Sequence, residues 1–421
     1  MIETKELLPG VTLRCCRDTR FKQSCLSFAI LRPMCRAEAG LNALIPAVLL
    51  RGTKRYPDLR SITWKLDDLY GAAVGTQVRR IGDYQTTGLS CAFLEDRFAL
   101  PGDRVMEPML DFLRQLLLEP VLSGEGFRSE YVESEKRNLI ATIQSERNDK
   151  RAYALSRMLR TMCREDSYGI PRLGEAEDVA AIDPVGAYAH YQKILRESPI
   201  HIFYVGSAEA DTVAELLMPI FAGIDRNYVG LPEQTPFRGA PGGDITETMD
   251  VAQGKLCLGY TTPITNRDPE FPALQVMNVI FGAGMTSKLF VNVREKLSLC
   301  YDIGSSLYGA KGIVTVSAGI DFDREDQTRR EIARQLQAIC DGDVTEEEFL
   351  SAREALLSSL QAVHDSPGAI EGFYATAALN GQIRSAAERM EAIRAVTKEQ
   401  VAEAARSLSL HTTYFLKGAS E

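Results

Sequence analysis

Residues 281–305 read FGAGMTSKLFVNVREKLSLCYDIGS and form the most distinctive stretch of the chain. Apolar residues at helical spacing precede it, so Gly282 and Gly284 are typical of a turn that ends one helix before Ser287 caps the next. The stretch is not a nucleotide-binding P-loop, because that motif needs Gly-Lys-Ser/Thr after four intervening residues and should follow a strand. It therefore predicts a glycine turn between two helices.

The same pattern occurs earlier in the chain, which indicates a duplicated unit. The matching positions are Ala43-Leu44 and Gly52 with Ala273-Leu274 and Gly282, and Lys65-Leu66 and Tyr70 with Lys296-Leu297 and Tyr301. In each half these residues are followed by strands that alternate apolar and polar side chains, and then by further helices. The shared order of elements predicts two homologous halves.

A segment rich in Gly, Pro and polar residues, 223–244, is the best candidate for a linker. It divides the chain into an N-terminal half, residues 1–222, and a C-terminal half, residues 245–421, each long enough for its own core. The order of elements predicts an α+β fold in which each half is a mainly antiparallel sheet with helices packed on one face. Two such halves joined by a linker are expected to enclose a cleft that suits a peptide.

The stretch 281–305 resembles the C-terminal-half signature of the pitrilysin/insulinase metallopeptidase superfamily, especially short two-chain members such as the mitochondrial processing peptidases. The resemblance is carried by the glycine turn, by Ser287-Lys-Leu-Phe290, by Arg294-Glu-Lys296 and by Leu299-Cys-Tyr301. The duplicated halves, the linker and the C-terminal strand Tyr414-Phe-Leu-Lys-Gly418 resemble the family as well, so the resemblance spans nearly the whole chain. It implies a peptidase fold of two halves that holds a peptide.

The zinc-binding motif of that family is absent from the place where the resemblance puts it. Active members carry HxxEH on a helix just before Lys/Arg-Gly-Thr, and the latter is present here as Arg51-Gly-Thr53. Counting back, Ala43, Pro46 and Ala47 stand where the two histidine ligands and the glutamate base would be. Alanine and proline side chains neither coordinate zinc nor transfer a proton. Pro46 also predicts that the helix opens near 42–45, since proline is tolerated only near a helix start.

The third zinc ligand of the family is a glutamate that lies seven residues after another glutamate in a later helix. The matching segment keeps the first of these as Glu135 and has Thr142 at the ligand position. An alignment shifted by one helical turn is also open, because Glu133 and Glu146 lie nearby. A single remaining carboxylate does not rebuild a zinc site. Restoring HxxEH alone is therefore not expected to recover activity.

Histidine is scarce, with four in 421 residues and no two of them three to five positions apart, so no helix presents a histidine pair to a metal. We expect the four to be structural or exposed: His190, His201, His364 and His411. The nine cysteines include no CxxC pair and are expected to be reduced, with Cys300 a buried small residue rather than a nucleophile. No metal and no cofactor is expected.

The charge balance disfavours two classes of partner. With 57 acidic and 48 basic residues the net charge is −9, and no run of Lys or Arg occurs, so neither nucleic acid nor a membrane is expected as a partner. No apolar stretch approaches the roughly 20 residues of a membrane helix, and the first residues lack the apolar core of a signal peptide. We therefore expect a cytoplasmic location.

Arg294 and Tyr301 are the candidate substrate-binding side chains. They share a face if the helix continues, or lie at a helix end and the following strand. Considered alone, they are better explained by a surface ion pair of Arg294 with Glu295 and by a tyrosine packed on the sheet. The resemblance reverses this preference, because it implies that the pair holds the substrate backbone near the scissile bond, with the loop of Gly282 and Gly284 close by. An Arg fork donates two hydrogen bonds, and a Tyr hydroxyl can donate to a carbonyl or an oxyanion.

The leading hypothesis is a zinc-free, non-catalytic subunit that pairs with a separate HxxEH-bearing paralogue and helps position a peptide or unfolded polypeptide substrate. One alternative is an assembly protein that keeps the fold only as an interaction surface, which does not require Arg294 and Tyr301 to be exposed in a cleft. The other is a stand-alone peptidase with an atypical metal site, which predicts near-stoichiometric zinc in the purified chain.

Overall fold

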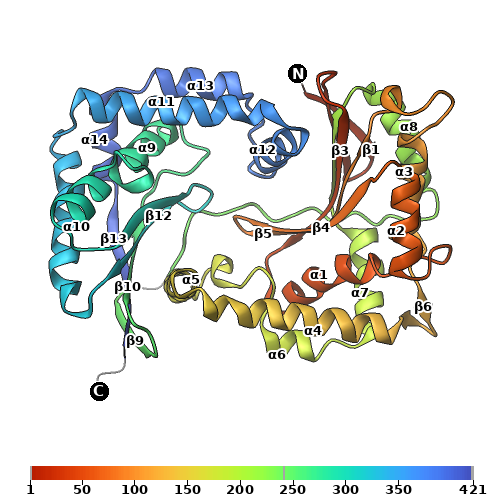
Figure 1. Cartoon of the computed structure of the whole chain (residues 1–421), viewed down its shortest axis with the longest axis horizontal. Coiled ribbons are helices and arrows are strands. Elements are labelled where there is room, and N and C mark those ends of the chain that lie inside the picture. Colours follow the sequence, from red (N-terminus) through yellow and green to blue (C-terminus); the bar gives the residue numbers. More distant parts are fainter. Residues whose placement is uncertain (1, 240–241, 419–421) are drawn as a thin grey trace. The chain divides into compact units, whose positions relative to one another are not determined.

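The computed structural model describes residues 2–239 and 242–418, and the chain divides into two compact units that exchange segments (Figure 1). Unit 1 comprises the residues up to 144, 170–233 and 363–379; unit 2 comprises 145–169, 234–362 and the residues from 380 onward. The predicted halves, 1–222 and 245–421, are contiguous in sequence, whereas each observed unit contains a segment from the other half.

Unit 1 is built on a six-stranded, mainly antiparallel sheet in which β2 and β8 are a parallel pair. In spatial order the strands are β1 (Ile2–Leu8), β2 (Val11–Arg17), β8 (Ile200–Gly206), β3 (Gln23–Pro33), β5 (Tyr84–Leu94) and β4 (Ala73–Ile81). Strand β3 alternates between the two faces: Leu26, Phe28 and Ile30 join the main core, while Ser27 and Ala29 face the opposite side. This alternation gives the sheet one strongly apolar face.

Helices cover that apolar face. The long helices of this core are α1 (Arg36–Leu49), α3 (Met106–Leu118), α7 (Pro184–Glu197) and α8 (Ala210–Phe221). The remaining elements here are α2 (Leu59–Asp68), α4 (Ser129–Ser145), α6 (Ala176–Ala180) and the short strands β6 (Leu122–Ser123) and β7 (Gly126–Phe127). Helix α1 therefore packs against the sheet with its buried side. This packing fixes the position of the residues at which a zinc motif would stand.

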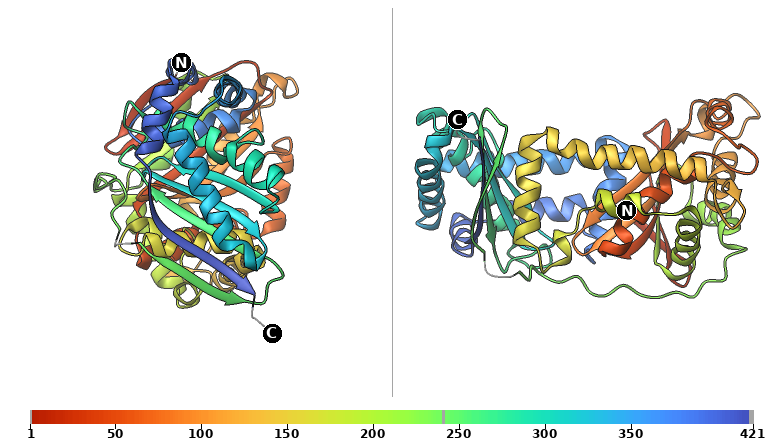
Figure 2. Two further views of the ribbon diagram at one scale, coloured as in Figure 1. Left: turned by 90° about the vertical axis from the view of Figure 1, so that its left-hand side faces the viewer. Right: turned by 90° about the horizontal axis from the view of Figure 1, so that it is seen from below.

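Unit 2 repeats this plan with a five-stranded sheet. In spatial order the strands are β11 (Asp302–Tyr308), β12 (Ile313–Ile320), β10 (Gly254–Thr261), β13 (Ser409–Gly418) and β9 (Asp244–Met249). The left-hand view of Figure 2 shows the C-terminal strand β13, in blue, between β9 and β10. Helices bury the apolar face of this sheet, among them α9 (Phe271–Asn278), α10 (Glu325–Cys340), α11 (Glu346–Ala362), α13 (Ala386–Arg394) and α14 (Lys398–Arg406).

The two sheets correspond strand by strand, which confirms the predicted α+β fold with two homologous halves. The series β4, β5, β3, β8 and β2 in unit 1 has the same order as β11, β12, β10, β13 and β9 in unit 2. The parallel pair falls at the same place in both series, as β8 with β2 and β13 with β9. Helices α4 and α11 have 17 residues each, and the helix that follows has 13 residues in both cases.

The helices that follow α4 and α11 are exchanged between the halves. Helix α12 (Pro367–Leu379) lies on the second face of the unit 1 sheet, where the ring of Tyr374 stacks on Phe203 with centroids 6.3 Å apart. Helix α5 (Lys150–Met162) lies on the second face of the unit 2 sheet, where Met158 and Met162 come so close to Gly259 that a Cβ there would clash. The prediction of helices on one face holds for the main layer, and the exchanged helix adds a second layer.

Candidate functional site

Helix α1 contains the three positions at which the zinc motif would stand, and Pro46 lies in its interior. The helix runs from Arg36 to Leu49, so the prediction that it opens near 42–45 was wrong. Pro46 has no backbone N–H and leaves the carbonyl oxygen of Asn42, four residues earlier, without its helical partner. The hydroxyl of Thr87 on β5 donates a hydrogen bond to this carbonyl. A contact from the sheet thus replaces the missing helical one, which explains why proline is tolerated here.

The side chain of Asn42 is fully buried and connects α1 to β5 and α7. Its Nδ2 donates to Oε1 of Gln85 at 2.9 Å, and its Oδ1 lies 2.8 Å from Nε2 of His190. Burial lowers the pKa of His190, so the ring is neutral at pH 7 and donates its Nε2 hydrogen to the asparagine. This histidine therefore links α7 to α1 through a hydrogen bond.

Thr87→Val is expected to lower the free energy of unfolding of unit 1 by about 1–3 kcal/mol, because it leaves the buried Asn42 carbonyl unpaired. Pro46→Ala in the same chain should restore most of this loss, since the alanine N–H can bond to that carbonyl within the helix. Urea denaturation of the wild type, both single variants and the double variant measures the coupling between the two sites. Strictly additive effects would contradict this account of how the proline is accommodated.

Of the other positions of the zinc site, only Glu135 carries a side chain that is a usual zinc ligand. Ala43 is 7% exposed and Ala47 is half-buried. Glu135, the carboxylate that remains, is held by Arg51, whose Nη1 lies 3.1 Å from its Oε1. Thr142 is exposed, and its hydroxyl donates to a carbonyl one turn earlier in α4 at 2.9 Å. Within residues 2–239 and 242–418, no group of three or more His, Cys, Asp or Glu side chains is arranged to hold a metal ion.

The two glycines of the predicted turn are placed differently in unit 2: Gly282 lies inside the π-type helical segment Val279–Ala283, and Gly284 follows it, before the second segment, Leu289–Lys296. Ser287 is buried, and its hydroxyl accepts a hydrogen bond from the backbone N–H of Phe290 at 3.3 Å. The serine therefore stabilises the start of the second segment, in agreement with its expected capping role.

The two glycines of the turn differ in the space around them. A Cβ on Gly282 would lie 2.8 Å from Cδ1 of Leu289 and 2.8 Å from Oγ of Ser305, which is too close for a side chain. A Cβ on Gly284 would meet no atom nearer than 3.9 Å. Close packing thus requires glycine at 282, whereas position 284 has room for a Cβ atom.

Arg294 lies at a helix end and Tyr301 beside the following strand, which is the second of the two arrangements considered for them. Arg294 lies in the last turn of the second segment, Tyr301 lies just before β11, and the chain reverses at Ser298 with a φ of 49°. The side chain of Arg294 is 39% exposed and Tyr301 is 61% exposed. The Arg294 guanidinium carbon lies 4.6 Å from the ring centroid of Phe290, and its Nε is 3.7 Å from Glu295. The ring sets the direction of the arginine, since the exposed ion pair is weak.

The hydroxyl of Tyr301 donates a hydrogen bond to Oδ1 of Asp321 at 3.0 Å. This bond raises the pKa of Tyr301, because it favours the protonated phenol beside a carboxylate. With its proton directed to Asp321, the phenol oxygen is left as an acceptor, suited to a peptide N–H rather than to a carbonyl. Asp321 was not predicted from the sequence, because it follows β12 and meets the tyrosine only through the pairing of β11 with β12.

Two further expectations concern the thiols and membranes. All nine cysteines are free, and burial raises the pKa of Cys300 to about 12, so this thiol is the buried residue that was expected and not a nucleophile. Of the described helices, none combines the length and the apolar character needed to cross a bilayer.

Comparison with known proteins identifies the family. The family described as "Peptidase M16 inactive domain" matches residues 187–356. The chain is 32% identical over 417 residues to the "Probable inactive metalloprotease YmfF" of Bacillus subtilis (strain 168), covering 99% of this chain and 98% of the relative. It is 27% identical over 118 residues, 28% of this chain and 29% of the relative, to the "Uncharacterized zinc protease YmxG" of the same organism.

A solved structure of similar fold supports this assignment. The crystal structure of a conserved protein from Enterococcus faecalis V583 has a TM-score of 0.93 and 28% identity, and it covers 100% of this chain and 99% of its own. The resemblance inferred from residues 281–305 is thereby confirmed. This chain belongs to the peptidase M16 family and is homologous to a relative named as a probable inactive metalloprotease.

Proposed function

We propose that this chain is a non-catalytic subunit that pairs with a separate paralogue bearing HxxEH and positions a peptide or unfolded polypeptide for that paralogue's zinc. The observation that carries the proposal is that Arg294 is partly exposed, Tyr301 is exposed and both are oriented by neighbours, in a chain that has alanine, proline and threonine at the zinc-motif positions. Arg294 is directed by Phe290 and Tyr301 by Asp321, so each is held without being buried.

The chemistry of the two side chains suits an extended peptide backbone. The guanidinium fork of Arg294 donates hydrogen bonds to carbonyl oxygens, while the hydroxyl oxygen of Tyr301 accepts one from an N–H. Together they match the donor and acceptor groups that alternate along a backbone and do not select side chains. The substrate class is therefore proposed to be broad, with specificity supplied elsewhere.

The pairing itself is supported by what one genome contains. Bacillus subtilis carries both the relative named as a probable inactive metalloprotease and the relative named as an uncharacterized zinc protease. We propose a division of labour of this kind for the present chain, with the zinc motif on the partner. Its place of action is proposed to be the cytoplasm, where its nine free thiols stay reduced.

The test is coexpression of the chain with the HxxEH-bearing paralogue of its own genome, followed by copurification and hydrolysis of a fluorogenic peptide. Arg294→Ala is expected to lower kcat/KM of the pair by roughly 10–100-fold, the loss of about 1.5–3 kcal/mol from a charged hydrogen bond. The matched control is Arg334→Ala, because Arg334 is also exposed and pairs with the neighbouring Glu331 at 2.7 Å.

Two outcomes would contradict the proposal. The first is that the paralogue never copurifies and hydrolyses the peptide equally well alone. The second is that the pair forms but Arg294→Ala and Arg334→Ala have the same kcat/KM, which would favour an assembly role for the fold.

A further inference from the structure

A groove in unit 1 lies between the first turns of α1, helix α6 and the start of α7, three helices that Figure 1 labels. Its volume is about 260 Å³, and it is partly open to solvent. Pockets that enclose a whole small molecule usually measure about 300–1,000 Å³, so this space suits one long side chain. Its apolar lining includes Leu41, Ile182 and Ala187, and its charged lining consists of Arg36, Asp178 and Asp183.

The groove exists because α6 is short and lies close to α1. A Cβ on Gly40 would lie 2.9 Å from Cγ2 of Val179, so glycine at this position lets α6 pack tightly on α1. Helix α6 ends after five residues, whereas the helix at the same place in the order of unit 2, α13, has nine and buries Ile393 in its core. The groove therefore begins where α6 stops, beside the exposed Ala181.

Negative charge exceeds positive charge around the groove. Arg36 pairs with Asp178, with Nε and Oδ2 3.0 Å apart. The hydrogen bond to Asp178, together with the charges of Asp178 and Glu177, raises the pKa of Arg36, so Glu177 also lies within reach of this guanidinium. Asp183 accepts hydrogen bonds from two backbone N–H groups in the first turn of α7 and so caps that helix. Asp178, Asp183 and Glu177 thus outnumber Arg36.

The lysine that contacts the groove lining does not change this balance. Lys136 of α4 donates a hydrogen bond to the carbonyl of Ile182 at 2.8 Å, and its Nζ lies 2.9 Å from Oε1 of Glu133. This pair of opposite charges adds no net charge. An incoming positive charge is therefore attracted to the groove, while an incoming negative charge is repelled.

We propose that this groove binds the lysine or arginine side chain of an extended polypeptide. The aliphatic stem packs on Leu41, Ile182 and Ala187, and the charged end reaches the carboxylates of Asp178 and Asp183. Long basic side chains combine an apolar stem with a charged end, which is the combination that this lining accepts. The site adds a preference for basic residues to the proposed function, on which that use of it rests, but the binding itself depends on unit 1 alone.

The test uses the methyl groups that line the groove. The full chain is labelled with ¹³C in its Ile, Leu and Ala methyl groups, and Ile182→Val identifies the resonance of Ile182. It is titrated in low-salt buffer with three acetylated and amidated pentapeptides, in which alanines flank a lysine, a norleucine or a glutamate. The lysine peptide is expected to shift the Ile182 signal to saturation. Norleucine has a stem like that of lysine without its charge and should bind roughly tenfold more weakly, and the glutamate peptide should give no shift.

Charge variants test the carboxylates. Asp178→Asn is expected to raise Kd for the lysine peptide roughly threefold to fivefold, and Arg36→Gln to lower it by a similar factor, because the arginine competes for Asp178. The matched control is Asp111→Asn on α3, which should leave Kd unchanged. The side chain of Asp111 is 47% exposed, against 39% for Asp178, and it pairs with Arg114 at the same distance of 3.0 Å.

Three results would overturn the proposal. They are the lack of a saturable shift at Ile182 with the lysine peptide, equal affinity for the norleucine peptide, and equal affinity of Asp178→Asn and Asp111→Asn for the lysine peptide. The titration uses the chain without its partner. Failure of the proposed pairing with a zinc-bearing paralogue therefore leaves this result unaffected, and failure of the groove to bind leaves the copurification result unaffected.

Discussion

Asp166→Ala is expected to lower the free energy of unfolding of unit 2 by about 3–5 kcal/mol. The side chains of Asp166 and Lys311 are 3% and 0% exposed, and their charged atoms are 2.9 Å apart. The carboxylate also accepts hydrogen bonds from the backbone N–H of Tyr168 at 2.8 Å and of Arg238 at 3.0 Å. Without it, the fully buried ammonium group of Lys311, which also donates to the carbonyl of Thr235 at 2.9 Å, loses the counter-charge of Asp166.

Urea denaturation combined with hydrogen exchange of the amides in β10, β12 and β13 measures this effect. Glu165→Ala is the matched control, because its side chain is 64% exposed and lies 3.9 Å from Arg164, so the expected change is below about 0.5 kcal/mol. Combining Asp166→Ala with Lys311→Met should recover much of the loss, since a buried pair removed as a whole leaves no unpaired charge. Equal losses for Asp166→Ala and Glu165→Ala would contradict the role given to the pair.

The duplicated architecture was predictable because its signals are local. Alternating strands, helical spacing and the repeated glycine positions are read within each half. The corresponding strands have the same order in both sheets, as expected for two homologous halves. The exchange of α5 and α12 was not predictable from these signals. The buried residues of α5, among them Tyr153, Ala154 and Met158, form an ordinary amphipathic pattern that does not specify which sheet the helix meets.

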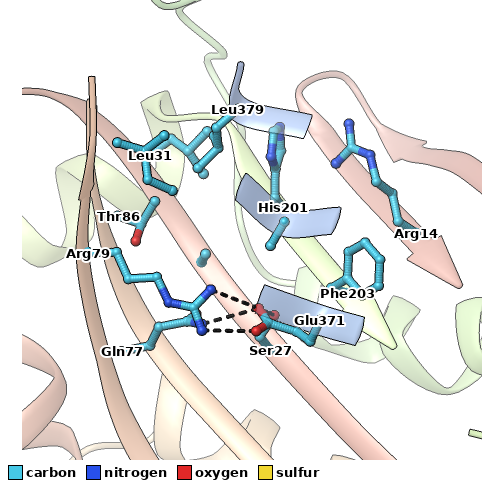
Figure 3. Close-up of a pocket in the computed structure, with 13 residues that line it drawn as sticks. Arg14, Ser27, Leu31, Gln77, Arg79, Thr86, His201, Phe203, Glu371 and Leu379 are labelled. Atoms are coloured by element: carbon cyan, nitrogen blue, oxygen red, sulfur yellow. Dashed lines mark hydrogen bonds and ion pairs between the residues drawn. The ribbon is translucent and has the colours of Figure 1, made fainter. Parts of the chain in front are cut away.

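The site was predictable where a motif has fixed spacing and not where partners come from distant strands. Ala43, Pro46 and Ala47 were located by counting from Arg51-Gly-Thr53, and this required no knowledge of packing. The start of α1 was predicted wrongly because the rule for proline assumes an unpaired carbonyl, which Thr87 in fact satisfies. The hydrogen bonds that Glu371 of α12 accepts from Ser27, Gln77 and Arg79 likewise have no sequence signal, because they form only after the helix has packed on the sheet (Figure 3).

Glu371→Ala is expected to lower the free energy of unfolding of unit 1 by about 2–3 kcal/mol. Glu371 is the charged residue of α12, its side chain is 4% exposed, and its carboxylate accepts hydrogen bonds from Ser27 at 2.7 Å, Arg79 at 2.9 Å and Gln77 at 3.2 Å. Removing it leaves buried donors unpaired on the sheet. The cost is smaller than at Asp166, because the side chain of Arg79 is 35% exposed and can turn toward water.

Glu371→Gln keeps an acceptor for Ser27 and should cost only about 1 kcal/mol. Glu209→Ala, at a carboxylate that is 60% exposed and pairs with Arg17, is the control expected to change little. Hydrogen exchange should show lost protection in β3, β8 and α12 for Glu371→Ala, while the amides of unit 2 keep theirs. Equal loss of protection in both units would show that α12 does not belong to the cooperative structure of unit 1.

The variants at Asp166 and Glu371 together form a crossed experiment on the exchange of segments. Asp166 belongs to the N-terminal half of the sequence but stabilises unit 2, and Glu371 belongs to the C-terminal half but stabilises unit 1. If the halves folded as contiguous domains, each substitution would destabilise the unit that carries its own half of the sequence. The exchanged helices predict the reverse pattern, because each half completes the second face of the other's sheet and anchors itself there through one buried carboxylate.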